Sequence, residues 1–234
     1  MTKNQHQVQK IPSTDDFRKR FLPYSKQAFE ALPKMEMPRL LDVGCGSGAA
    51  TIKLAEWLDG EIIGIDIDNG SLDSFREKIK NKALSSRIKA IKTSFIRNDF
   101  KDHSFNILWA EGVFHIIGYD KSLKESYRLL TQKGFLVIVD TLEILEKNKK
   151  KFKNCGFKVY DQINWEENAW WTEYYGPLEA KIKELKNKKI DPAFYSHLTD
   201  HEQDINLIKR NPKKFDCAHL ILQKINKKID RKED

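Results

Sequence analysis

The stretch LLDVGCGSG, residues 40–48, constrains the fold of this 234-residue chain more than any other. An apolar run that stops at glycines predicts a buried strand followed by a tight turn. Gly44, Gly46 and Gly48 stand at alternate positions, and glycines let a backbone turn approach a ligand closely. Three ligands suit such a turn: a triphosphate, a pyrophosphate, or a nucleoside without phosphate.

The residues around the turn distinguish these ligands. A triphosphate-binding P-loop needs a lysine directly after its last glycine, and this turn contains none. The dinucleotide fingerprint, GxGxxG, is one residue longer than the GxGxG found here. Asp42 would repel a pyrophosphate, whereas it would attract an ammonium or sulfonium group. The turn therefore favours S-adenosylmethionine, which carries both cations.

A second acid supports a nucleoside ligand. Asp66, within the stretch GIDID, lies at the end of the second predicted strand, 18 residues after Gly48. A carboxylate at that position can accept hydrogen bonds from both hydroxyls of a ribose. A dinucleotide and an adenosyl ligand would use Asp66 alike, so it predicts a ribose without choosing between them.

With these residues the chain resembles the class I S-adenosylmethionine-dependent methyltransferases of the small-molecule type. LLDVGCGSG resembles their first motif and GIDID their second-strand motif, while DHSFNILWAEG and LLTQKGFLVIVD resemble their fourth and fifth strands. The resemblance covers about residues 38–165, and residues 217–225 fit the family's last strand. It implies an α/β, Rossmann-like fold with a seven-stranded, mostly parallel sheet, an antiparallel last strand and helices on both faces.

Hydrophobic patterning predicts the same organisation, because apolar runs alternate with segments of helical period. We expect strands at 39–44, 61–68, 87–94, 105–112, 134–140, 157–165 and 217–225. A single domain over 1–234 would comprise an N-terminal tail and helix (1–37), a cofactor-binding core (38–165), a helical and aromatic insertion (166–216) and the last strand (217–225).

The resemblance also implies which residues bind the cofactor. Gly44, Gly46 and Gly48 would lie under its methionine part, Asp42 would orient its ammonium group, and Asp66 would hold the ribose. Ile67 would pack on the adenine, next to Ser94 and Phe95 at the end of the third strand. Many family members have an acid there that bonds the adenine amino group, so Ser94 is a weaker acceptor.

The methyl acceptor is expected beyond the carboxyl ends of the strands, where open α/β sheets bind their ligands. Glu111 and Asp140 end the fourth and fifth strands. Glu111 and His115 are four residues apart, so a helical turn after the strand would place them on one face. Either is a candidate catalytic base, or a group that orients an amine or hydroxyl. The alternative is that Glu111 bonds the cofactor or backbone and His115 packs against a lid.

The stretch NWEENAWWTEYYGPLEA, residues 164–180, holds five aromatic residues within 11 positions. It resembles a segment that follows the sixth strand in a subset of small-molecule methyltransferases. One interpretation makes Trp171 and Tyr175 an aromatic wall over the acceptor, with cation–π contact to an amine. The other is a satellite core, which we favour for Trp165.

Composition leaves three functions open. A net charge of +8 suggests nucleic acid, but the lysine-rich runs contain little aromatic interleaving and are typical of solvated helices. A small-molecule methyltransferase is therefore favoured over an RNA methyltransferase and over a non-catalytic cofactor-binding module. Three scattered cysteines, and a start without an apolar segment, favour a cytoplasmic protein. No membrane partner is expected, and no metal, since His197 and His201 lack a third ligand at motif spacing.

Overall fold

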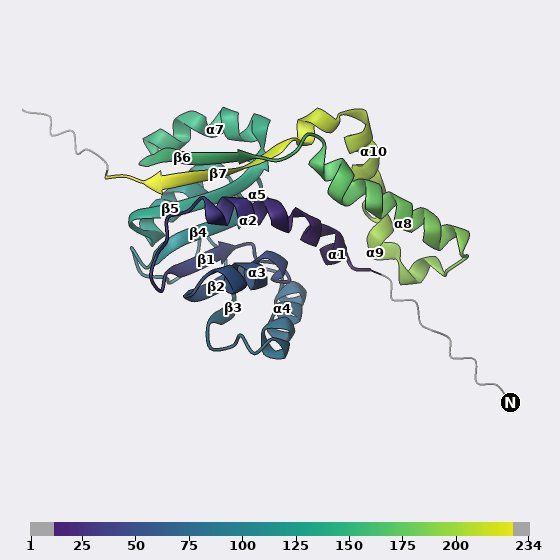
Figure 1. Cartoon of the computed structure of the whole chain (residues 1–234), viewed down its shortest axis with the longest axis horizontal. Coiled ribbons are helices and arrows are strands. Elements are labelled where there is room, and N and C mark those ends of the chain that lie inside the picture. The colour runs from purple at the N-terminus through teal and green to yellow at the C-terminus, as the bar shows by residue number, and fades with distance from the viewer. Residues whose placement is uncertain (1–11, 227–234) are drawn as a thin grey trace, which may run out of the picture.

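The computed structural model describes residues 12–226, and residues 1–11 of the predicted N-terminal tail lie outside that range. One seven-stranded sheet forms the centre, in the order β3-β2-β1-β4-β5-β7-β6 (Figure 1). Its strands are β1 Arg39–Val43, β2 Glu61–Asp66, β3 Ile88–Lys92, β4 Phe105–Glu111, β5 Leu130–Thr141, β6 Phe157–Asn164 and β7 Cys217–Lys224. β7 runs antiparallel to both neighbours and the other pairs are parallel, which confirms the predicted fold class.

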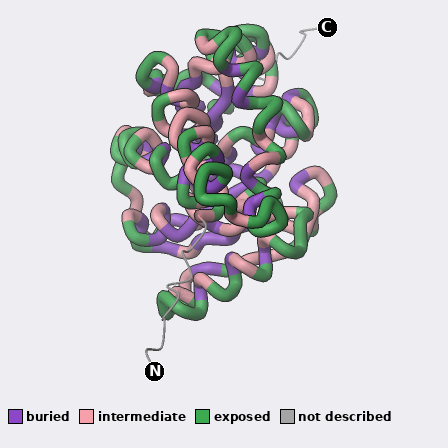
Figure 2. Tube along the Cα trace, turned by 90° about the vertical axis from the view of Figure 1, so that its right-hand side faces the viewer, coloured by how far each residue is buried: buried purple, intermediate pink, exposed green. Residues whose placement is uncertain are grey.

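Helices cover both faces of the sheet. The helices α2 Leu22–Glu30, α3 Ala49–Trp57 and α4 Asn69–Asn81 share a core with one face. On the other face pack α5 Phe114–Ile117, α6 Tyr119–Leu129 and α7 Leu142–Asn154. Figure 2 shows the buried residues running through the middle of the molecule. Because side chains alternate along a strand, Trp109 and Glu111 of β4 point to the α2 face while Leu108 and Ala110 point to the other.

The N-terminal helices and the insertion form a third packed region. Helix α1 Thr14–Arg18 passes through a 3-10 turn, Lys19–Phe21, into α2. The insertion contains a π-helical turn, Trp170–Tyr175, followed by α8 Gly176–Asn187, α9 Ser196–Thr199 and α10 Glu202–Arg210. Helices α8 to α10 project beyond the carboxyl ends of the parallel strands (Figure 1). Their apolar side chains pack against Phe17 and Phe21, so the N-terminal helix joins the insertion to the sheet.

Three predicted strand ends differ from the structure by two to four residues, and the first is that of β2, which ends at Asp66 rather than 68. β5 begins at Leu130 rather than 134, where the buried Lys224 donates to the carbonyls of Tyr127 (2.6 Å) and Leu130 (2.7 Å). β3 ends at Lys92 rather than 94, because Ser94 turns back to form a bridge with Arg97. None of the helices in residues 12–226 is long and apolar enough to cross a membrane.

Candidate active site

The glycine turn joins β1 to α3 in a backbone conformation that favours glycine. Gly44, Gly46 and Gly48 have φ angles of 70°, 51° and 77°. A Cβ at Gly48 would meet the Phe75 ring at 2.0 Å, so packing as well as φ requires glycine there. A Cβ at Gly46 would meet nothing within 4 Å. The turn is therefore tightly packed below Gly48 and open beside Gly46, as a ligand cradle requires.

Two predicted acids brace this turn. Asp42 is buried and accepts a hydrogen bond from Thr51 Oγ1 at 2.5 Å. Burial raises the pKa of Asp42 to about 7, although the bond from Thr51 opposes that shift. Asp66 accepts from the Gly46 N–H at 2.8 Å and from the Asp68 N–H at 2.9 Å. The end of β2 is thus bound directly to the glycine turn.

A pocket lies between the glycine turn and the N-terminal helices. Four predicted site residues line it: Asp42, Gly44, Gly46 and Glu111. Five others come from the N-terminal helices, which the sequence motifs did not implicate: Asp15, Arg18, Phe21, Leu22 and Ser25. Asp15 fixes this wall to the turn, since it accepts from the Ser47 hydroxyl and from Lys78 Nζ (2.9 Å). The pocket is therefore built from segments that are distant in the sequence.

The predicted adenine contacts follow the ends of β2 and β3. Ile67 follows β2 and is 73% exposed, so it offers an apolar surface. Phe95 is buried and packs on Phe114 at a ring distance of 5.9 Å, so its side chain faces the core. The Ser94 hydroxyl accepts from the Ile96 N–H at 3.3 Å. The roles of these three residues toward adenine stay predictions.

Glu111 is the acid that opens on the pocket. Its Oε1 atom accepts from Ser25 Oγ (2.8 Å), Trp109 Nε1 (2.8 Å) and His219 Nε2 (3.4 Å). Trp165 Nε1 in turn donates to His219 Nδ1 at 2.9 Å. Burial by itself raises the pKa of Glu111, but its interactions with His219, Trp109 and Ser25 together outweigh burial and hold that pKa below its ordinary value.

The expectation that Glu111 and His115 share a face is wrong. Gly112 has a φ of 65° and redirects the chain, so the helical turn begins only at Phe114. His115 is 44% exposed, and its Nδ1 lies 3.2 Å from Asp140 Oδ2, on the opposite side of the sheet from the Ser25 contact of Glu111. The Tyr119 hydroxyl also donates to Asp140 Oδ2, at 2.9 Å. Asp140 therefore orients His115, and Glu111 belongs to a separate network.

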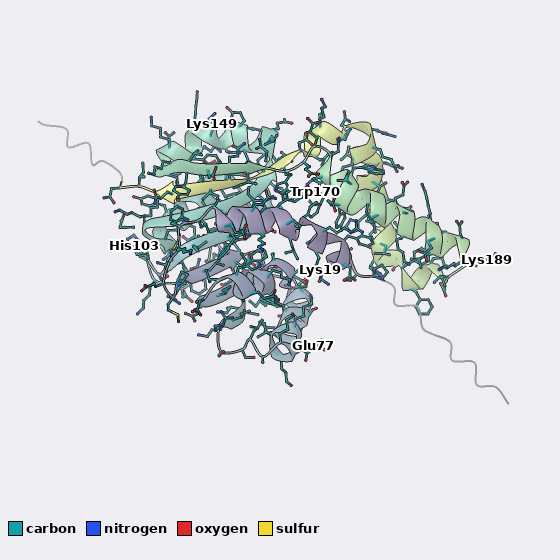
Figure 3. All side chains as sticks on the ribbon, viewed as in Figure 1. Lys19, Glu77, His103, Lys149, Trp170 and Lys189 are labelled. Atoms are coloured by element: carbon teal, nitrogen blue, oxygen red, sulfur yellow. The ribbon has the colours of Figure 1, made fainter. Side chains whose placement is uncertain are left out.

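The aromatic stretch packs against the N-terminal helices. Trp165 stacks on Phe21 (4.8 Å) and on Tyr24 (4.9 Å), in agreement with the satellite-core interpretation. Trp170 lies where the sheet meets α8 (Figure 3).

The two residues predicted to contact the acceptor lie further out along this stretch. The Trp171 ring lies 5.2 Å from Lys209 Nζ. Tyr175 packs on Tyr174 at 4.7 Å and on Trp170 at 5.8 Å. Neither is among the described residues that line the pocket. Their contact with an acceptor stays a prediction.

Residues 41–138 match the family model described as a methyltransferase domain. This range contains the glycine turn, Asp66 and Glu111. The chain carries a class I S-adenosylmethionine-dependent methyltransferase domain. S-adenosylmethionine is the cofactor of such a domain, and the open side of Gly46 between two acids fits its cationic methionine part.

Curated relatives of the methyltransferase domain act on different compounds. A demethylmenaquinone methyltransferase from Bacteroides fragilis is 31% identical over 142 residues, which cover 60% of this chain and 56% of that protein. A sterol 4-C-methyltransferase from Caenorhabditis elegans is 26% identical over 135 residues, or 56% of this chain and 40% of that protein. The chain thus spans about half the length of these relatives.

Solved structures share the fold of the methyltransferase domain over most of the chain. A Galdieria sulphuraria protein classed as a sarcosine dimethylglycine methyltransferase has a TM-score of 0.70 and 18% identity, and covers 89% of this chain and 86% of its own. A Haemonchus contortus phosphoethanolamine N-methyltransferase in complex with S-adenosylmethionine has a TM-score of 0.65 and 17% identity, with 92% and 61% covered. At these identities the likeness shows the fold alone.

Proposed function

We propose that this protein transfers a methyl group from S-adenosylmethionine to a nucleophilic atom of a small molecule. The pocket between the open side of Gly46 and the carboxylate of Glu111 supports this function. The N-terminal helices close one side of that pocket, which suits a small acceptor better than a nucleic acid strand. The curated relatives named for a quinone and for sterols also act on small molecules.

The residues have separable roles in this proposal. The bound cofactor supplies a methyl group that is already activated on a sulfonium. Asp66 holds the ribose, and Asp42 orients the methionine part from beneath the turn. The protein mainly has to position the acceptor and exclude water. His115 lies on the other side of the sheet from Glu111 and outside the described lining of the pocket, so it is the proposed base only for an acceptor that reaches that side, where Asp140 orients its ring through Nδ1.

Calorimetry with S-adenosylmethionine tests the cofactor site. Replacing Asp66 with Ala should weaken binding about 10- to 100-fold, because the ribose loses charge-assisted hydrogen bonds worth about 1.5–3 kcal/mol. Asp99→Ala is a matched control, since Asp99 is an exposed aspartate beyond the end of β3. If Asp66→Ala and Asp99→Ala bind S-adenosylmethionine with equal affinity, the proposed ribose contact of Asp66 is rejected.

Turnover separates methyl transfer from the alternative functions. Mass spectrometry should detect S-adenosylhomocysteine when the wild-type protein is incubated with the cofactor and a panel of amines, phenols, thiols and quinols. Tight cofactor binding without product across that panel would favour a non-catalytic module. Product formed only with RNA would favour an RNA methyltransferase.

A further inference from the structure

The two oxygens of the Glu111 carboxylate are used differently. All hydrogen bonds that described residues make to Glu111 go to Oε1, from Ser25, Trp109 and His219. Oε2 receives none from the described part of the chain, although the side chain is 30% exposed and lines the pocket. Helix α2, β4 and β7 therefore hold one oxygen in place and leave the other for a ligand.

The Glu111 carboxylate lacks a positive partner among the described residues. Its one ion-pair contact is His219. Because Trp165 donates to His219 Nδ1, that nitrogen carries no proton, and the single ring proton sits on Nε2 and points at Glu111. His219 is thus a neutral donor. An ionised carboxylate in a recess without a counter-ion is unfavourable until a cation arrives.

The rest of the described pocket wall contains more acidic than basic side chains. Asp42 and Asp15 also line it, and Arg18 is the one basic residue among its described lining. Asp15 already pairs with Lys78 at 2.9 Å. The recess therefore has more acidic than basic residues in its described lining, which favours a ligand that carries a cation.

We propose that Glu111 Oε2 binds the ammonium group of a ligand in this pocket, and that Ser25, Trp109 and His219 are its positioning residues. The inference rests on the proposed function, because the ammonium belongs either to the methionine part of the cofactor or to an amine that accepts the methyl group. Glu111 serves as an electrostatic anchor rather than as the catalytic base, since three donors stabilise its ionised form.

The variant Glu111→Gln removes the negative charge of the side chain and keeps its size. Its amide oxygen can still accept from the three donors, while its NH₂ group faces the pocket and repels a cation. Calorimetry with S-adenosylhomocysteine and with 5′-methylthioadenosine, which lacks the amino-acid part, tests the cofactor as the source. If the cofactor is the source, Glu111→Gln weakens S-adenosylhomocysteine binding about tenfold or more and leaves methylthioadenosine within about twofold.

A second pair of probes tests the acceptor as the source. Dimethylaminoethanol is cationic near neutral pH, and 3-methylbutan-1-ol is its uncharged carbon isostere. If the acceptor is the source, the wild-type protein binds the amine about tenfold more tightly than the alcohol, and Glu111→Gln removes that preference. Glu77→Gln is the matched control, because Glu77 is an exposed glutamate on α4.

The outcomes separate this proposal from the proposed function. If Glu111→Gln alters neither the cofactor comparison nor the amine preference, the ammonium site is overturned even though the wild-type protein binds cofactor. If the wild-type protein binds no cofactor, the proposed function fails, and the amine pair still decides the role of Glu111.

His219 variants test the positioning role. His219→Gln retains an N–H donor toward Glu111, whereas His219→Leu removes it. The glutamine variant should keep most of the ammonium preference and the leucine variant should lose it. Melting temperatures of both variants show whether stability alone explains the difference. Equal ammonium preference in the two variants would reject the positioning role.

Discussion

Glu111 ends β4 and Asp140 is the next-to-last residue of the neighbouring β5, yet their carboxylates lie in opposite surroundings. The Glu111 side chain is 30% exposed and opens on the pocket, whereas that of Asp140 is 3% exposed. Glu111 faces α2, and Asp140 faces Tyr119 of α6. The difference teaches that a position at the carboxyl end of a strand does not by itself make an acid part of the site. The face of the sheet decides it.

Hydrogen bonding follows the same division. Both Asp140 oxygens accept bonds, Oδ1 from the Thr141 N–H (2.9 Å) and Oδ2 from Tyr119 (2.9 Å) and His115 (3.2 Å). From the residues that the structure describes, Glu111 accepts hydrogen bonds with Oε1 alone. Asp140 is therefore a structural acid that orients its neighbours, and Glu111 keeps capacity for a ligand.

Alanine at each position should show the largest contrast. Asp140→Ala leaves the buried Tyr119 hydroxyl and the Thr141 N–H without partners, so the free energy of unfolding should fall by about 3 kcal/mol. Glu111→Ala leaves a space that joins the pocket, so water can replace Oε1 at the three buried donors and the loss should be smaller, about 1 kcal/mol. Urea denaturation of both variants measures the difference. Equal losses would contradict the division between the two acids.

Asp42 sharpens the comparison, because it is an acid in the pocket wall that is nevertheless buried. Its pKa rises on folding from 3.8 to about 7. Since the folded state then binds the proton more tightly, the free energy of unfolding should fall as pH rises between these values. In the wild-type protein the free energy of unfolding should fall by about 2 kcal/mol between about pH 5 and about pH 8, and in Asp42→Asn this fall should be absent. Urea denaturation across that range checks it, and an unchanged slope would disprove the assignment to Asp42.

Removing one hydroxyl from each network should give the smallest effects. Ser25→Ala deletes a donor to Glu111 and should weaken S-adenosylhomocysteine or amine binding about three- to fivefold, with little change in stability. Tyr119→Phe deletes a donor to Asp140 and should lower the free energy of unfolding by about 1 kcal/mol without altering binding. Calorimetry measures binding and urea denaturation measures stability in both variants. Weaker binding in Tyr119→Phe would contradict the assignment of Asp140 to a structural role.

The sequence predicted the parts of the site that are local in the chain. Strand β1, the glycine turn and the acid Asp66 follow from apolar runs, glycines and one spacing, and these signals occupy fewer than 30 residues. The antiparallel last strand was predicted through the family resemblance, and the antiparallel pairing of β7 with β5 and β6 confirms it.

No local sequence pattern predicted the pocket wall opposite the glycine turn. Ser25 meets Glu111 across 86 positions, and His219 meets it across 108. No period or motif spacing encodes a contact of that separation, because it depends on which face of the sheet each element packs against. The left-handed conformation of Gly112, which separates Glu111 from His115, was also not anticipated.

The family model covers the glycine turn but only part of the pocket wall opposite it. The family model spans residues 41–138, which include Trp109 and Glu111 but exclude Ser25, Trp165 and His219. The N-terminal helix, the insertion and the last strand therefore lie outside the region that the family model covers. If proteins that share this domain methylate different acceptors, we expect the sequence differences to lie in those outer segments. A comparison restricted to the shared motif does not include them.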